Sequence, residues 1–141
     1  MTTPLALEIF DQLHELAHRY RAQLHQRLEA LYPDLTFNEM RVLMHTGRRP
    51  GVTHKDLIER SHTDKAQMTR TITTLEERGW LTRTPSANDK RVRCLHLSAA
   101  GLHLFQQEQQ AQQRIAGALL QDWPLALQQE LLGWLHKTTQ E

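Results

Sequence analysis

The feature of the sequence that most constrains the fold is an abrupt change of pattern at Gly79. Apolar residues before it repeat at helical spacing up to Leu75, and an apolar strand begins directly after it at residues 80–84. A turn rich in Pro, Asp, Lys and Arg over residues 85–93 then leads into a second alternating strand at 94–98. The chain therefore has to form a helix that passes without a linker into a β-hairpin with a charged tip.

Two short capped helices come before the hairpin, at residues 53–60 and 64–78. Their caps are the capping box Thr53-x-x-Asp56 and the N-cap Asp64, with Gln67 in the position that reaches back. The tight turn between them makes a helix-turn-helix, whose second helix is the recognition helix. With the hairpin added, this is the layout of a winged helix-turn-helix, in which the helix enters a DNA major groove and the hairpin tip reaches toward the adjacent minor groove.

Other helices flank this region. Apolar residues recur at steps of three and four over residues 5–31, which predicts a long first helix, and the capping box Thr36-x-x-Glu39 opens a second helix to about Thr46. After the hairpin, Ser98 caps a helix from Ala99 to about Asp122. Pro124 stands in the first turn of a last helix. We therefore expect a mainly α fold with a small β-hairpin wing (α+β), in a single domain over residues 1–141. Within it, about 36–98 form the winged helix-turn-helix DNA-binding region, and about 5–31 and 99–138 form N- and C-terminal dimerisation helices.

The apolar stripes of the terminal helices are too long for the small winged region to cover. An exposed apolar surface of this size predicts a partner, and the simplest partner is a second copy of the chain. We therefore expect a homodimer in which the terminal helices of two subunits interlock.

Charge is distributed unevenly along the chain. Residues 48–93 contain eleven Lys or Arg against six Asp or Glu, and the remainder contains six against ten. A basic central block between acidic helices is typical of a protein with one face against phosphates. Double-stranded DNA is therefore the expected partner, and a module that only binds other proteins would leave the basic wing unexplained.

Several classes of protein are excluded by the sequence. No apolar run approaches the roughly 20 residues that cross a bilayer, and Glu8 and Asp11 replace the basic start of a leader, so we expect a cytoplasmic protein without membrane contact. A single cysteine, Cys94, fits a reducing compartment. No Gly-rich phosphate loop, nucleophile elbow or base beside Cys94 is present, so we expect neither an enzyme nor a cofactor.

Taken in order, these features resemble the MarR family of bacterial transcription regulators over essentially the whole chain. The resemblance rests on the helix order and on Thr69-Arg70, Leu75-Glu76-x-x-Gly79, Asp89-x-Arg91 and Leu97-Ser98-x-x-Gly101. Departures are mild: Lys90 where the family often has Arg, and Ser98 where it often has Thr. The resemblance implies an obligate homodimer with six helices per subunit, in the bacterial cytoplasm and on the nucleoid when bound to DNA. It also implies a repressor of pseudo-palindromic operators, modulated by a small, often aromatic molecule between the dimer helices and the winged domain.

On the recognition helix, Met68, Ile72 and Leu75 share one side and should face the core. The other side presents Gln67, Thr69, Arg70 and Thr73 as candidate DNA-binding residues. Arg can read guanine and Gln can read adenine through two bonds each, whereas the threonines can reach phosphate or pack a methyl group against thymine. Lys65 at the helix start and Lys55 are candidate phosphate contacts.

In the wing, Asp89 beside a hairpin tip would repel DNA unless it held an arginine in place. The family resemblance assigns the minor-groove contact to Arg91 and its orientation to Asp89. The simpler alternative is a salt bridge that only shapes the hairpin, which at an exposed site contributes about 0–1 kcal/mol. Arg83 and Arg93 are expected to contact phosphates, and Lys90 belongs to the same basic tip.

The alternative function is a metal- or oxidant-responsive regulator of the same fold. His14 and His18 lie four apart on one helix face, which is half of a zinc site, but no further ligands appear at matching spacing. Cys94 lies in the second wing strand, where its exposure is undetermined by the pattern. The sequence leaves unassigned the effector and its binding residues, the operator sequence and target genes, and whether binding represses or activates transcription.

Overall fold

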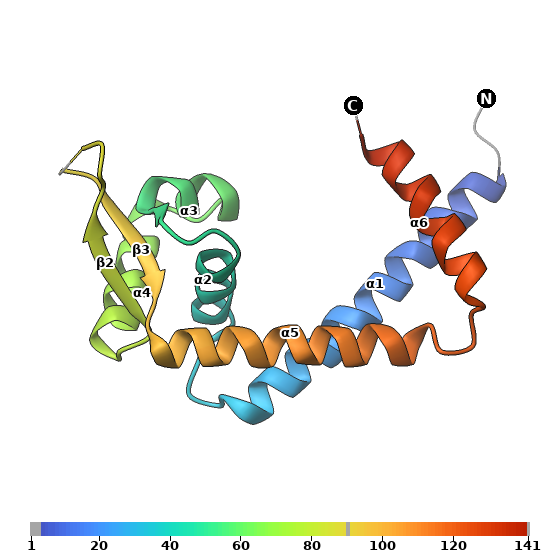
Figure 1. The fold of residues 1–141 in the computed structure, drawn as a ribbon, viewed down its shortest axis with the longest axis horizontal. Helices are drawn as coiled ribbons and strands as arrows, with labels where there is room; N and C mark the ends of the chain where they lie inside the picture. The colour runs from blue at the N-terminus through green and yellow to red at the C-terminus, as the bar shows by residue number, and fades with distance from the viewer. Residues whose placement is uncertain (1–3, 90, 141) are drawn as a thin grey trace. The chain divides into compact units, whose positions relative to one another are not determined.

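The computed structural model describes residues 4–89 and 91–140 (Figure 1). Its elements are α1 (Pro4–Leu31), α2 (Phe37–Arg48), β1 (Val52–Thr53), α3 (His54–Ser61), α4 (Lys65–Glu77), β2 (Leu81–Pro85), β3 (Arg93–Leu97), α5 (Ala99–Leu119) and α6 (Leu125–Thr139). The mainly helical fold with a small antiparallel sheet is confirmed. The chain divides into two compact units: a winged unit, residues 25–111, and a helical unit made of residues up to 24 and from 112 onward. The expected single domain over residues 1–141 stays a prediction.

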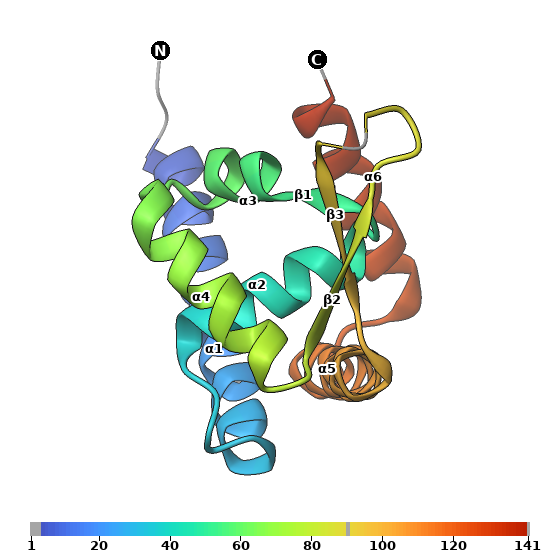
Figure 2. The same cartoon turned by 90° about the vertical axis from the view of Figure 1, so that its left-hand side faces the viewer.

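The winged unit has one apolar core. Its completely buried members come from α2, α3, α4, β3 and α5: Leu43, Leu57, Ile72, Leu75, Leu95 and Leu104. Because each of these elements contributes at least one such side chain, the core fixes the recognition helix against the rest of the unit. The hairpin of β2 and β3 follows the end of α4, and β2 contacts that helix (Figure 2).

Three helix starts in this unit are set by side-chain caps. The boxes of Thr36 with Glu39 and of Thr53 with Asp56 are both complete, as predicted. Asp64 accepts a bond of 2.8 Å from the Gln67 backbone N–H, but no return bond from the Gln67 side chain is found in the described part of the chain. That half of the prediction is wrong, because the Gln67 side chain lines a small cavity between α2, α3 and α4 instead.

Glu39 also connects two helices. Its carboxylate accepts the Thr36 backbone N–H at 2.8 Å and lies 3.4 Å from Nη1 of Arg78, the C-cap residue of α4. The carboxylate is buried, so both partners offset the cost of taking it out of water. The start of α2 and the end of the recognition helix are therefore linked by one side chain.

The sheet contains a strand that the sequence does not predict. Val52 and Thr53 form β1 and pair with Leu95 and Cys94 of β3, giving the strand order β1-β3-β2. Two residues are too few to show alternation, so no pattern marks this strand. Its effect is to attach the start of α3 to the wing.

The change of pattern at Gly79 has the predicted structure. Gly79 has a φ of 81°, in the left-handed region, and the Trp80 N–H closes the end of α4 on the Leu75 carbonyl at 2.8 Å. Ser98 then joins this turn to the next helix: its hydroxyl donates to the Gly79 carbonyl at 2.6 Å and accepts the Gly101 N–H at 3.1 Å. Ser98 thus caps α5, as expected.

The helical unit exposes much of its apolar surface. Its large exposed side chains are Leu5, Leu7, Ile9, Phe10, Leu125, Leu127, Leu132, Trp134 and Leu135. An apolar groove of about 520 Å³ runs between the two ends of the chain, lined by Leu5, Ile9, Leu13, Leu16, Trp123 and Leu131 among others. Among the described helices, none is both long and apolar enough to cross a membrane.

Two boundaries in this unit differ from those predicted. α5 ends at Leu119 rather than near Asp122, and Pro124 is the N-cap of α6 rather than a residue of its first turn. The polar run Gln106–Gln113 lies within α5, so a continuous helix crosses it. The predicted and observed boundaries differ because the few residues between Leu119 and Leu125 have no periodic pattern that marks the last helical position.

Candidate nucleic-acid interface

The recognition helix α4 has one buried and one exposed side. Met68, Ile72 and Leu75 are buried in the core, as predicted. Lys65, Thr69, Arg70 and Thr73 are exposed on the other side. For Arg70 and Lys65 no ion pair is found in the part of the chain that the structure describes. This side of α4 therefore offers two cations and two hydroxyl-bearing side chains to solvent.

Gln67 is placed differently from these residues. It is half-buried and lines the small cavity with residues of α2 and α3. This position follows from its place at the margin of the apolar side, one residue before Met68. The adenine contact of Gln67 stays a prediction, and its side chain lies at the edge of the buried side of α4.

Thr69 has two close partners. Its hydroxyl donates to the Lys65 carbonyl at 2.8 Å and lies 3.1 Å from Nε2 of His54. His54 is the first residue of α3, fifteen positions earlier in the chain. Sequence reasoning did not select His54, because only the packing of α3 against α4 brings it to the recognition helix.

Several charges act on His54. Burial lowers the pKa of the imidazole, and the neighbouring cations Arg83 and Lys65 lower it further, while Glu76 acts in the opposite direction. Each of these groups lies on α4 or β2, so the ring is at the junction of the helix-turn-helix and the wing. A neutral His54 is favoured by these surroundings.

Two predicted phosphate contacts are engaged within the protein. Arg83 of β2 forms an ion pair with Glu76 of α4, with 2.6 Å between Nη2 and Oε1. Lys55 lies 4.0 Å from Glu59 one turn along α3, and both side chains are well exposed. Arg83 is thus the more firmly held of the two. Glu76 of the motif Leu75-Glu76-x-x-Gly79 therefore ties β2 to α4 through this ion pair, a role that the sequence motif does not indicate.

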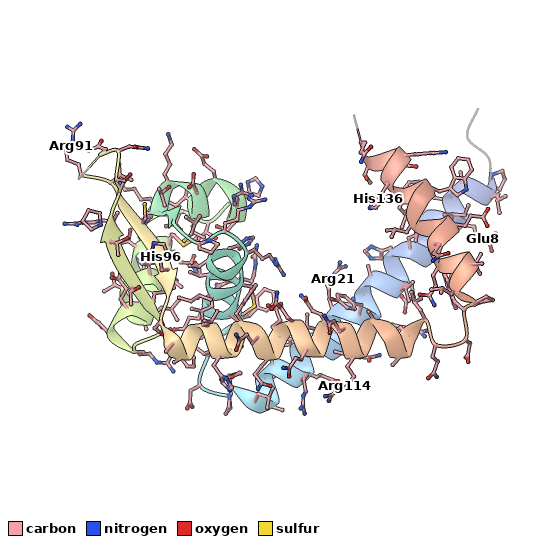
Figure 3. The ribbon with its side chains drawn as sticks, viewed as in Figure 1. Glu8, Arg21, Arg91, His96, Arg114 and His136 are labelled. Atoms are coloured by element: carbon pink, nitrogen blue, oxygen red, sulfur yellow. The ribbon has the colours of Figure 1, made fainter. Side chains whose placement is uncertain are left out.

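The wing tip shows the predicted pairing of Asp89 and Arg91. Oδ1 of Asp89 accepts the Arg91 backbone N–H at 3.0 Å and Nε at 3.3 Å. The Arg91 side chain is 91% exposed and extends away from the hairpin (Figure 3). Arg93, at the start of β3, is also exposed, whereas Lys90 lies outside the described residues. The carboxylate therefore holds the base of an arginine whose end projects into solvent.

The residues considered for sensing do not gather into a site. No group of three or more His, Cys, Asp or Glu side chains capable of holding a metal ion occurs among residues 4–89 and 91–140. His14 and His18 are exposed on α1. Cys94 is half-buried in the middle of the sheet, between its pairing partners Thr53 and Thr84.

Comparisons with known proteins agree with this geometry. Residues 34–92 match a family model described as the MarR family. The transcriptional regulator HosA of Escherichia coli is 33% identical over 92 residues, which are 65% of this chain and 65% of that protein. The chain thus aligns with somewhat less than two thirds of this relative.

Two solved structures share the fold. A mutant MarR from E. coli complexed with operator DNA has a TM-score of 0.67 and 22% identity, covering 94% of each chain. Streptococcus pneumoniae FabT in complex with DNA has a TM-score of 0.70 and 20% identity, covering 92% of this chain and 96% of that one. At this identity the likeness concerns the fold.

Proposed function

We propose that the chain is a transcriptional regulator of the MarR family, to whose model residues 34–92 match, and that it binds DNA sequence-specifically as a homodimeric repressor of a pseudo-palindromic operator in the bacterial cytoplasm. The observation that carries the proposal is the exposed side of α4 together with a wing tip, in the same unit, where Asp89 hydrogen-bonds to Arg91. Arg70 and Thr73 are exposed on α4, where a recognition helix would present them to base edges, and Arg91 extends from the hairpin. The family and the relative matched are regulators of transcription rather than enzymes.

The homodimer is supported by the helical unit. Leu132 and Trp134 of α6 are 53% and 60% exposed, and Phe10 of α1 is 66% exposed. An apolar groove lies in the same unit. A second copy of this unit would cover these side chains and place two recognition helices on one DNA duplex, which a palindromic operator requires.

We further propose that a small, aromatic effector modulates DNA binding through the spacing of the two recognition helices. An effector that binds one dimer geometry more tightly shifts the population toward it. A thousandfold loss of operator affinity corresponds to about 4 kcal/mol of coupling. The support for this proposal is the match of residues 34–92 to the family model. Displacement of a fluorescent operator by members of a panel of aromatic acids is the test, and no displacement by any member would contradict it.

The DNA-binding proposal is tested by selection. The purified protein is used to enrich duplexes from a random-sequence library, and affinities for the enriched and unenriched duplexes are measured by fluorescence anisotropy. Arg70→Ala should reduce affinity for the enriched duplex by about 1–3 kcal/mol and narrow its advantage over unenriched DNA, because a base contact is lost. Arg114→Ala, at an exposed arginine in the helical unit, is the control and should bind as the wild type does.

Failure of the library to converge on any sequence would contradict sequence-specific binding. An equal loss of affinity for all DNA in Arg70→Ala would assign Arg70 to the phosphate backbone instead.

The dimer is tested separately by sedimentation. Leu132→Asp places a charge on the exposed apolar surface of α6 and should convert the protein to a 16.5 kDa monomer with much weaker operator binding. Gln129→Asp introduces the same charge at an exposed polar position of α6 and should leave the dimer intact. A wild-type protein that sediments as a monomer at micromolar concentration is incompatible with the proposal.

A further inference from the structure

We propose that Thr69 contacts DNA through its methyl group rather than its hydroxyl, and that His54 is the positioning residue that fixes this orientation. The inference rests on the proposed DNA binding and specifies how one residue reads the operator. It starts from the hydrogen bonds of the free protein: Thr69 Oγ1 to the Lys65 carbonyl at 2.8 Å and to His54 Nε2 at 3.1 Å.

A threonine hydroxyl has a single hydrogen to donate. The Lys65 carbonyl accepts only, so the hydroxyl hydrogen of Thr69 is used in that bond. The His54 contact is then satisfied only if Nε2 carries a hydrogen and donates it to Oγ1. Thr69 therefore has no hydrogen left for a phosphate oxygen, or for guanine N7 and O6 or thymine O4.

The exposed remainder of the Thr69 side chain is its Cγ2 methyl group. In the major groove the apolar partner of a methyl group is the C5-methyl of thymine. Thr69 stands directly before Arg70, the candidate guanine reader, and both are exposed. The geometry thus assigns a thymine to Thr69 within each half-site.

Thr73 provides an internal contrast. It lies one helical turn beyond Thr69 on the same exposed side of α4. No side-chain hydrogen bond of Thr73 is found within the described residues, whereas Thr69 and Thr71 both donate to carbonyls four residues earlier. The Thr73 hydroxyl keeps its hydrogen for DNA. Two threonines four residues apart should therefore respond in opposite ways to the same substitutions.

The charges around His54 do not disturb this arrangement. Lys65 and Glu76 of α4 and Arg83 of β2 act on the ring, and on its own helix Lys55 is exposed while Asp56 accepts the Thr53 backbone N–H. Nε2 carries a hydrogen both in the required neutral tautomer and in the protonated ring. The bond to Thr69 should therefore persist across the pH range in which His54 titrates.

The first experiment compares Val and Ser at both threonines on the duplex enriched by the wild-type protein. Val keeps a methyl group and removes the hydroxyl, whereas Ser does the reverse. We expect Thr69→Val to bind within about threefold of the wild type, because a β-branched Val in a helix keeps one χ1 rotamer without the hydrogen bond to His54. Thr69→Ser should lose about fourfold per half-site, which is the worth of one buried methyl group. At position 73 we expect the reverse order, with Val losing affinity and Ser retaining it.

The second experiment removes the partner methyl group. Each thymine of the half-site is replaced in turn by uracil, which lacks only the C5-methyl. One such replacement should weaken wild-type binding by about fourfold per half-site and have no effect on Thr69→Ser. The methyl contact would be overturned if every uracil replacement still weakened DNA binding by Thr69→Ser. It would also be overturned if Thr69→Val lost as much affinity for the enriched duplex as Thr69→Ser.

The positioning role of His54 is tested by substitutions that remove and restore an N–H donor, and by locating the hydrogen on its ring. His54→Ala should weaken operator binding and abolish the sensitivity to uracil, whereas His54→Gln, which keeps an N–H donor, should restore both. His103→Gln, at an exposed histidine of α5, is the matched control and should change neither. In the DNA-free protein, ¹⁵N–¹H correlation spectra should show the hydrogen on Nε2 of His54; a neutral ring with its hydrogen on Nδ1 refutes the positioning role whatever the protein binds. A library that fails to converge on a sequence refutes the proposed DNA binding. The tautomer is measured without DNA, so it tests the role of His54 independently of that function.

Discussion

Asp89 accepts two hydrogen bonds from Arg91, one from its backbone and one from its side chain, and both residues lie at the tip of the wing. A carboxylate at this place repels phosphates if it acts only through its charge. Because it also fixes the base of the Arg91 side chain, its removal has two opposing effects on DNA binding. Mutagenesis can determine which effect is larger.

We expect Asp89→Ala to lower operator affinity even though it removes a negative charge near DNA. The reason is that Arg91 loses the carboxylate that holds the base of its side chain, and with it the orientation proposed to bring the guanidinium to the minor groove. Arg91→Ala should also weaken binding, and the double variant should lose less than the sum of the two single losses. Glu77→Ala, which deletes an exposed carboxylate of α4, is the control and should bind equally well or more tightly. Tighter binding by Asp89→Ala, or additive losses, would show that the two residues act independently.

Histidine protonation gives a second prediction at this scale. In the folded protein burial lowers the pKa of His45, helped by Arg41, Arg48 and Arg49, and the pKa of His54 is lowered as well. The unfolded chain, with histidine pKa values of about 6.5, then binds more protons than the folded one. The free energy of unfolding should therefore decrease as the pH falls below about 6.5.

Urea unfolding between pH 8 and pH 5 measures this dependence (roughly the window of histidine titration). His45→Gln should flatten the curve, whereas His103→Gln should leave it unchanged. Stability that rises on acidification over this interval would contradict the direction of both shifts.

At the scale of elements, local signals in the sequence predicted the helix starts at Thr36 and Thr53 and the stop at Gly79, but not the end of α5 or the N-cap position of Pro124. The capping boxes at Thr36 and Thr53 and the stop at Gly79 involve residues within five positions of one another, so a pattern reveals them. β1 is set instead by pairing with a strand about forty residues later, and a two-residue segment carries no periodicity of its own.

In the candidate site, too, contacts between residues close in sequence were predicted and contacts between distant elements were not. The exposed side of α4 and the Asp89–Arg91 pair are contacts within one helix or one turn, and both were predicted. The Arg83–Glu76 ion pair and the His54–Thr69 bond depend on β2 and α3 packing against α4. Residue types alone do not specify such partners, because any nearby carboxylate or hydroxyl would satisfy the same chemistry.

The junction of the wing with α5 gives a prediction for an element boundary. A Cβ atom at Gly101 would lie 2.5 Å from the Trp80 carbonyl oxygen and 3.2 Å from Leu97 Cδ2. The carbonyl already accepts the Ser98 N–H, so it cannot move away freely. Gly101→Ala should therefore push the first turn of α5 off the hairpin and cost about 1–3 kcal/mol in the free energy of unfolding.

Gly117→Ala is the matched control on the same helix. A Cβ atom at Gly117 would meet nothing within 4 Å, so this variant should be neutral or more stable by up to about 1 kcal/mol. Chemical unfolding of both variants checks the difference. Equal stability of the two would mean that the turn at Trp80 yields more readily than its hydrogen bonds indicate.

For the whole molecule, the salt dependence of DNA binding reports how many cations meet phosphates. If Lys55, Lys65, Arg91 and Arg93 of both subunits do so, log affinity against log salt should have a slope of about −7. Arg83 is left out of this number because Glu76 already compensates its charge in the free protein. Arg93→Gln should make the slope shallower by about 2, one unit for each subunit, whereas Arg83→Gln should change it much less.

A wild-type slope shallower than about −3 would exclude the basic block as the interface. A full two-unit change in Arg83→Gln would show that Arg83 leaves Glu76 for phosphate in the complex.

The tryptophans give the protein its own optical labels. Trp80 is half-buried in the winged unit with its ring edge-on to Tyr32, at 5.9 Å between centroids, whereas Trp123 and Trp134 belong to the helical unit. Trp134 is exposed on the apolar surface proposed to be covered in the dimer. With Trp80→Phe, fluorescence emission comes from the helical unit alone, and with Trp123 and Trp134 replaced by Phe it comes from the winged unit alone. Subunit dissociation and changes at the wing can thus be followed as separate spectral signals, without attaching a dye.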